Sequence, residues 1–136
     1  MVERFSSGGT WETVFGYSRA VVAGPWILSA GCTATVDGVV RHPGDPAAQA
    51  RTAFGIALDA IARAGAAPSD VVRTRMYVVG PQHADAVGRA HGELFGAVRP
   101  VSTLVMVARL IHPDQLVEVE VEAYRPFPAD SQLRRR

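Results

Sequence analysis

Apolar and polar positions follow two different periods along this chain. Period-two alternation and short apolar runs predict strands at residues 18–23, 26–30, 33–36, 39–40, 71–79, 102–108 and 116–124. Gly24-Pro25 and Asp37-Gly38 are typical hairpin turns between the early strands. Two stretches with helical spacing interrupt the strands. With the short runs 33–36 and 39–40 counted as one element, the order is β-β-β-α-β-α-β-β.

The first helical stretch has clear boundaries. Asp45 and Pro46 are suited to the N-cap and the first helical position, and Gly65 follows the end. An apolar stripe recurs between them at Ala50, Phe54, Ala57, Leu58 and Ile61. The second helix is predicted at about residues 82–95, with Val87, Leu94 and Phe95 on its inner side.

This order predicts an α+β fold, a single domain over residues 1–136 in which two helices cover one face of a mixed sheet. Residues 129–136 are expected to form a loose tail. In residues 104–108 both alternating sets are apolar, so both faces of that strand are expected to be dry. Because the helices cover only one face, a partner subunit is expected to cover the other.

The last strand alternates strictly between apolar residues and glutamates. Glu118, Glu120 and Glu122 therefore lie on one face, at intervals of about 7 Å. The row is either a solvated face or the wall of a pocket at a subunit boundary. In the second case a carboxylate can act as a general base.

Composition narrows the function classes. Apolar residues make up 48% and charged residues 20%, which indicates a packed core and not a disordered chain. The net charge of +1 argues against a dedicated nucleic-acid binder. The N-terminus lacks a signal-peptide pattern, and the apolar run at 20–31 is too short to span a membrane. A cytoplasmic protein is expected.

The sequence contains few residues in the patterns typical of metal sites or catalytic nucleophiles. The four histidines are scattered and no metal-ligand spacing occurs, so neither a metal nor another cofactor is expected. Cys32 is the single cysteine, which excludes an intramolecular disulfide and favours a reducing compartment. Its thiol is either a nucleophile aided by a distant histidine or a small buried apolar group.

Several motifs, in order along nearly the whole chain, resemble the RidA (YjgF/enamine–imine deaminase) family. They are Gly16-Tyr17-Ser18, Ile27-Leu28-Ser29-Ala30-Gly31, Asp45-Pro46-Ala47-Ala48-Gln49-Ala50, Asp70-Val71-Val72-Arg73-Thr74, His91-Gly92-Glu93-Leu94-Phe95, Arg99-Pro100-Val101-Ser102-Thr103, Val107-Ala108-Arg109-Leu110 and Val119-Glu120-Val121-Glu122-Ala123. The resemblance implies a chorismate-mutase-like fold and a homotrimer with three clefts between neighbouring subunits. By the same resemblance, Glu120 would activate water, while Tyr17 and the backbone at Gly31 would shape the cleft.

The chain departs from the family pattern at positions expected to bind substrate. Ser102 stands where the deaminating members have the arginine that holds the substrate carboxylate, and a serine cannot replace that charged clamp. Gly88 replaces a common asparagine and Cys32 a glutamine. Arg75 or Arg99 could supply the missing cation from elsewhere.

Three functions follow from this sequence. The first is a hydrolase, or deaminase, of small imine- or enamine-like metabolites, with Glu120 activating water and Ser102, Tyr17 and Gly31 holding the ligand. The second is a non-catalytic homologue that binds a small molecule in the same cleft between subunits. The third is an endoribonuclease, which the balanced charge disfavours because nucleic-acid binding is expected to need a basic strip.

Overall fold

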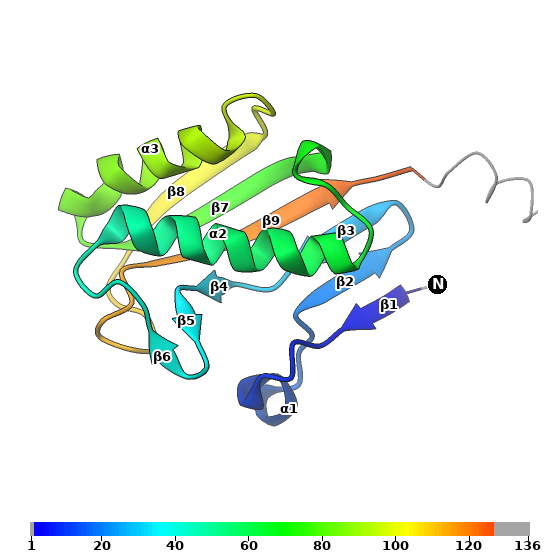
Figure 1. Cartoon of the computed structure of the whole chain (residues 1–136), viewed down its shortest axis with the longest axis horizontal. Helices are drawn as coiled ribbons and strands as arrows, with labels where there is room; N and C mark the ends of the chain where they lie inside the picture. The colour runs from blue at the N-terminus through cyan, green and yellow to red at the C-terminus, as the bar shows by residue number, and fades with distance from the viewer. Residues whose placement is uncertain (1, 127–136) are drawn as a thin grey trace, which may run out of the picture.

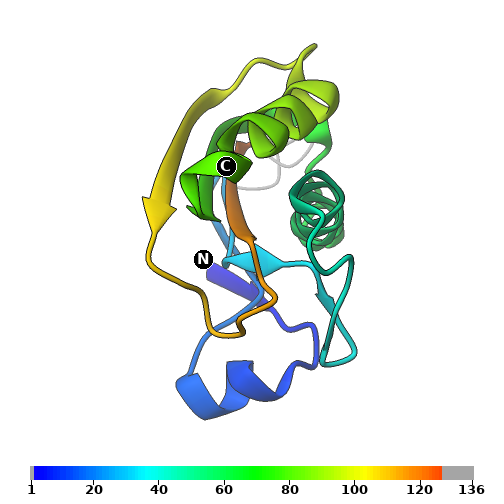
Figure 2. The same cartoon turned by 90° about the vertical axis from the view of Figure 1, so that its left-hand side faces the viewer.

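The computed structural model describes residues 2–126, so the tail predicted at 129–136 lies outside the described residues. A seven-stranded mixed sheet carries the two long helices, α2 and α3, on one face (Figures 1 and 2). The strand order is β1-β2-β3-β9-β7-β8, and the short strand β4 also pairs with β9. Strands β7 and β8 are parallel, and the other pairs in this sheet are antiparallel. The predicted α+β class, with two helices on one face of a mixed sheet, is confirmed.

The elements have the following bounds. The strands are β1 Val2–Phe5, β2 Ala20–Ala23, β3 Trp26–Ser29, β4 Cys32–Thr33, β5 Thr35–Val36, β6 Val39–Val40, β7 Val71–Val79, β8 Val101–Val107 and β9 Val117–Tyr124. The helices are α1 Thr10–Phe15, α2 Pro46–Arg63 and α3 Ala84–Phe95, with short 3₁₀ turns η1 Pro68–Asp70 and η2 Pro81–His83.

Helix α2 forms as its sequence predicts. The Asp45 carboxylate accepts a hydrogen bond from the backbone N–H of Ala48 at 3.0 Å, and Pro46 occupies the first turn. The predicted stripe packs against the sheet, with Phe54 and Ile61 fully buried and Leu58 only partly buried at its side.

Helix α3 corrects the prediction in two places. It begins at Ala84, because residues 81–83 form the 3₁₀ turn η2. Its inner side consists of Val87, Ala90 and Phe95, whereas Leu94 is 36% exposed. The Phe95 ring packs edge-on against Phe54, with ring centroids 5.2 Å apart, and this contact turns Leu94 outward.

The N-terminal region was missed by the sequence patterns. Strand β1 pairs with β2, and α1 follows it, with Trp11 stacked on Phe15 on the exposed side. The buried residue of α1 is Glu12, whose carboxylate accepts hydrogen bonds from the backbone N–H and the hydroxyl of Ser7. Because the buried side chain of this helix is a glutamate held by local polar contacts, apolar periodicity could not reveal the helix.

The predicted strand 33–36 is also divided. Cys32 and Thr33 pair with β9 in the main sheet, while Thr35–Val36 pairs with β6 in a separate two-stranded sheet. Neither sheet includes Ala34, which is buried between the two short strands.

The face of the main sheet away from α2 and α3 is called the open face here. In β9, Val117, Val119 and Val121 point to the helices and are buried, so the alternate residues lie on the open face. At the sheet edge, β8 leaves Val101, Val105 and Met106 exposed by 58%, 42% and 44%. The predicted partner subunit would cover such apolar residues. None of the described helices is long and apolar enough to cross a membrane.

Candidate functional site

Glu120 projects from the middle of β9 on the open face. Its register partner on β7 is Arg75, and one carboxylate oxygen, Oε1, accepts a hydrogen bond from the Tyr77 hydroxyl at 2.7 Å. Arg75 Nη1 lies 3.4 Å from the same oxygen. The hydrogen bond to Glu120 is the main reason that the pKa of Tyr77 is raised. These contacts orient the Glu120 carboxylate through Oε1, and no hydrogen bond to Oε2 occurs within residues 2–126.

The other glutamate of the motif, Glu122, binds the neighbouring arginines. Arg75 Nη1 donates to Glu122 Oε1 at 2.7 Å, and Arg73 Nε lies 3.6 Å from Glu122 Oε2. The glutamate row is therefore a partly buried ladder in which Glu120 and Glu122 pair with arginines, and not a bare solvated face. Arg75 already pairs with Glu120 and Glu122, which argues against a role in binding the substrate carboxylate in place of the family arginine.

Gly31 lies in the connection between β3 and β4, beside the same ladder. Its carbonyl accepts a hydrogen bond from Arg19 Nη1 at 2.7 Å, and the Arg19 guanidinium lies 5.7 Å from the centre of the Tyr17 ring. A Cβ atom at position 31 would meet Glu118 Oε2 at 2.8 Å. A side chain at position 31 would therefore require the Glu118 carboxyl to move aside.

Glu118 was not singled out from the sequence, where it was one of three glutamates. It is partly buried, and burial raises the pKa of its carboxyl, with the nearby Glu120 charge adding to the effect and Arg19 opposing it. Among residues 2–126 it forms no ion pair within 4.0 Å.

Cys32 lies close to these groups but points to the helix side. It is 2% exposed, and its sulfur contacts the Ala30 carbonyl oxygen at 3.4 Å and Arg19 Nη1 at 3.5 Å. Burial raises the pKa of the thiol. These surroundings favour the interpretation of Cys32 as a buried apolar group over that of a nucleophile.

Ser102 and Gly88 lie in a different part of the structure. The Ser102 hydroxyl accepts a hydrogen bond from the hydroxyl of the fully buried Thr74 at 2.8 Å, and Thr74 Oγ1 also lies 2.7 Å from His91 Nε2. Gly88 is on the exposed side of α3, where a Cβ atom would have nothing within 4 Å. A three-membered chain of hydrogen bonds thus links β8 to α3.

The strand register separates the predicted residues into two groups. Ser102 pairs with Thr74, which faces the helices, whereas Glu120 pairs with Arg75, the next residue of β7, which faces the open side. Tyr17, Gly31 and Cys32 lie around Arg19, and Gly31 lies beside Glu118, which is two residues from Glu120 on β9. Gly88 and Ser102 belong to the helix side. One chain alone does not present Ser102 and Glu120 to the same small ligand.

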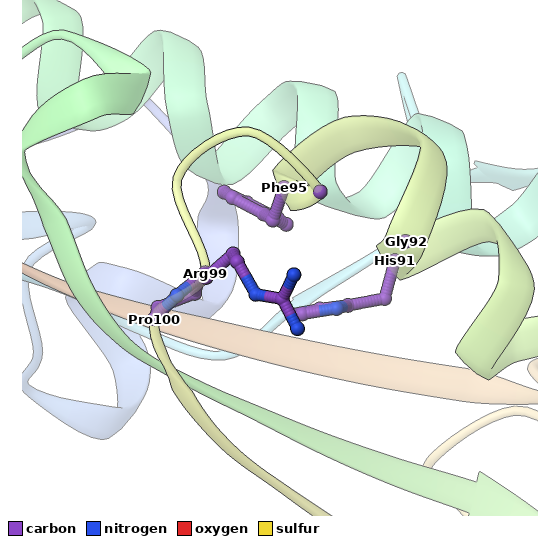
Figure 3. A pocket seen from close by; sticks show the side chains of 6 residues that line it. His91, Gly92, Phe95, Arg99 and Pro100 are labelled. Carbon is purple, nitrogen blue, oxygen red and sulfur yellow. The ribbon is translucent and has the colours of Figure 1, made fainter.

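A pocket of about 340 Å³ lies near the C-terminal end of α3 (Figure 3). It is lined by His91, Gly92, Phe95, Gly96, Arg99 and Pro100. Arg99 has a left-handed backbone with φ of 57°, and its side chain extends toward the His91 ring. Burial lowers the pKa of His91. Ser102 is not part of the lining, but Thr74 links its hydroxyl to His91.

Sequence reasoning missed Tyr77, Thr74, His91 and Glu118 as neighbours of the predicted site residues. Arg73, Arg75 and Tyr77 alternate along a predicted strand, so their shared face could have been found. Their partners could not, because strand pairing is decided in three dimensions. Among residues 2–126 there is no cluster of three histidine, cysteine or acidic side chains that could hold a metal ion.

The fold is that of a small α+β protein in which two helices cover one face of a mixed sheet (Figure 2). Arg73, Arg75 and the glutamates of β9 lie on the other face. The chain belongs to the family described as Endoribonuclease L-PSP, the YjgF/RidA family, whose sequence model matches residues 10–125. The family resemblance seen in the motifs is confirmed.

Individual relatives agree with this assignment. SCO2049, an uncharacterized protein of Streptomyces coelicolor, is 48% identical over 124 residues, covering 91% of this chain and 92% of the relative. The crystal structure of Rv2704 from Mycobacterium tuberculosis, a member of the YjgF/YER057c/UK114 family, is 43% identical and has a TM-score of 0.82, covering 91% and 99% of the two chains. TdcF of E. coli, solved with bound serine, is similar in fold at 20% identity, with a TM-score of 0.74 and coverage of 90% and 93%.

Proposed function

We propose that this protein is a hydrolase of small imine- or enamine-like metabolites, acting in a cleft between adjacent copies of a cytoplasmic homotrimer. The observation that carries the proposal is the placement of Glu120. Its carboxylate is fixed by Tyr77 and Arg75 through Oε1, and within residues 2–126 Oε2 has no hydrogen bond. Glu118, two residues away on the same strand, lies beside the Gly31 backbone. A positioned carboxylate like that of Glu120 suits general-base catalysis.

The chemistry at Glu120 is a simple hydration. Glu120 Oε2 takes a proton from water, the water oxygen bonds to the carbon of a protonated C=N group, and the π electron pair moves to nitrogen. The protonated Glu120 carboxyl returns this proton to the nitrogen. The C–N bond then breaks as the new hydroxyl gives its proton back to the Glu120 carboxylate and becomes the carbonyl, and the departing ammonia takes up that proton as ammonium. Tyr77 and Arg75 keep the base oriented throughout, so the reaction needs no cofactor.

The second half of the proposed cleft comes from a neighbouring copy. Ser102 and Gly88 face away from Glu120 within one chain, so a ligand that touches both groups must lie between two chains. The exposed apolar residues of β8 support association at this edge. The serine bound in the TdcF structure is of a size that fits a small-metabolite site in this fold.

The proposed activity is tested with Glu120→Gln. Imines generated in situ by an amine oxidase or an amino-acid oxidase serve as substrates, and ammonia release is compared with the uncatalysed rate. Removing a general base should lower kcat about a hundredfold or more. Glu93→Gln, which removes an exposed carboxylate on α3, is the matched control and should behave as wild type. Equal rates for Glu120→Gln and wild type would contradict the proposal.

The two other functions give different outcomes. A non-catalytic homologue would bind a small ligand between subunits without accelerating hydrolysis of any imine in the panel. An endoribonuclease, the activity in the family's description, would cleave RNA. Arg73 and Arg75 are paired with glutamates, which weighs against a phosphate-binding strip on the open face.

A further inference from the structure

The charge balance around Glu118 differs from that around the other two glutamates of β9. Glu120 and Glu122 both lie within ion-pair distance of Arg75, and Glu122 also of Arg73. Arg19, the remaining nearby cation, donates to the Gly31 carbonyl and lies 3.7 Å from Glu12. Within the described residues, therefore, the arginines beside this ladder are matched to other acceptors, and Glu118 is not.

Glu118 also has a definite position against the backbone. Its Oε2 would be 2.8 Å from a Cβ atom at residue 31, so the carboxyl occupies the space that Gly31 leaves open. It lies on the same face of β9 as Glu120, two residues away. A ligand that reaches the Gly31 backbone and the Glu120 carboxylate must therefore also meet Glu118.

In the opposite half of the proposed cleft, Ser102 supplies no positive charge that could bind a substrate carboxylate. Thr74 donates to the Ser102 oxygen, which leaves the Ser102 hydroxyl hydrogen free to donate to a ligand. That hydroxyl can bind a neutral or partly negative atom but cannot balance a carboxylate.

We infer that Glu118 selects the substrate class: the site takes imines that lack a carboxylate. The cationic iminium or N–H group of such an imine donates a hydrogen bond to the Glu118 carboxylate, beside the Gly31 backbone. The inference rests on the proposed function for the location of the ligand. The reaction is R–CH=NH₂⁺ + H₂O → R–CHO + NH₄⁺, with Glu120 taking the proton from water. A carboxylate on the same carbon would lie close to both glutamates and be repelled.

The surroundings of Glu118 agree with a cationic ligand. Burial and the Glu120 charge both raise its pKa, and an adjacent cation would reverse that shift. Binding of a cation should therefore release a proton from any Glu118 still protonated, and affinity should increase as the pH rises through the pKa of this group.

The test compares two imines that differ only by a carboxylate. An amine oxidase acting on butylamine gives the carboxylate-free imine, and an amino-acid oxidase acting on norvaline gives the same imine with an α-carboxylate. Ammonia release is measured for wild type, Glu118→Gln and the exposed control Glu93→Gln. We expect wild type to prefer the butylamine product by about tenfold or more in kcat/KM. Glu118→Gln should lose that preference, mainly through KM, while Glu93→Gln keeps it.

Calorimetric titration with butylammonium and butyrate separates this inference from the proposed hydrolysis. If no imine is hydrolysed faster but wild type binds butylammonium over butyrate and Glu118→Gln does not, the inference stands and the hydrolase proposal fails. If the norvaline imine is preferred, or if Glu118→Gln leaves the ratio unchanged, the hydrolase stands and the inference is overturned. A norvaline preference that disappears in Arg99→Gln would identify Arg99 as the missing cation.

Discussion

The helix-covered face and the open face of the sheet are built from alternate residues of the same strands. On β9, Val119 is fully buried against the helices, while its neighbours Glu118 and Glu120 lie on the open face among arginines and Tyr77. The first face is held by close packing of apolar groups, and the second by specific polar contacts. Substitutions on the helix side should therefore affect stability first, whereas those on the open face should affect ligand chemistry with little loss of folding.

The largest effect is expected at the centre of the helix-covered face. Phe54 is fully buried and packs against Phe95 and His91. Phe54→Ala should lower the free energy of unfolding by about 3–5 kcal/mol through lost burial and the cavity that remains. Urea denaturation measures this change. Ile111→Ala, at a side chain that is 80% exposed, should change stability by less than about 0.5 kcal/mol.

The next largest effect is expected on the hydrolysis rate when the carboxylate-binding arginine is restored at Ser102. Wild type should hydrolyse carboxylate-bearing 2-imino acids poorly, and Ser102→Arg should raise that rate about tenfold to a hundredfold, since a charge-assisted contact contributes about 1.5–3 kcal/mol. Adding Glu120→Gln should abolish the gain. The assay follows keto-acid formation from amino-acid oxidase products. Strong wild-type activity on these imines would instead point to another cation, such as Arg99 or a neighbouring subunit's arginine.

Association of the chains should respond to a charge on the β8 edge. Val105 is 42% exposed within one chain, so Val105→Asp should leave the fold intact and disrupt only an interface that covers this residue. Sedimentation at micromolar concentration is expected to show a trimer for wild type and a smaller species for the variant. A wild-type monomer would contradict the proposed intersubunit cleft.

A smaller effect is expected in the pH dependence of the free energy of unfolding, which should differ between Glu118 and Glu93. Burial raises the pKa of Glu118 above 4.5, so its bound proton stabilises the fold below that pH, and this stability is lost as the pH rises through the folded-state pKa. Glu118→Gln removes this decline. Arg51 lowers the pKa of Glu93, so the stability from that pair is lost as the pH falls, and Glu93→Gln should show the opposite slope. Urea denaturation between about pH 4 and pH 7 measures both slopes.

The smallest effect is expected for Cys32→Ser. The thiol is buried and contacts Arg19 and the Ala30 carbonyl, partners that a hydroxyl can keep. Activity on the preferred imine should stay within about twofold of wild type, with stability lower by about 1 kcal/mol. A variant that folds normally but loses turnover would show that the thiol takes part in the chemistry.

The sequence by itself determined the elements whose signal is local. Helix α2 follows from an N-cap, a first-turn proline and an apolar stripe, and β9 follows from strict alternation, so both were predicted close to their observed bounds. The glutamate row was placed on one face for the same reason. The motifs further identified the family without any knowledge of which residues touch.

Only the tertiary structure decided which of these residues share a site. The register of β7 against β8 and β9 places Ser102 and Glu120 on opposite faces, and the fold brings Gly31 under the Glu118 carboxyl, although 87 positions separate them in the chain. Strand alternation fixes only which residues of one strand share a face. Pairing and loop placement depend on contacts between distant segments, so the sequence pattern could not show that Glu118 is left without the arginine that Glu120 and Glu122 share.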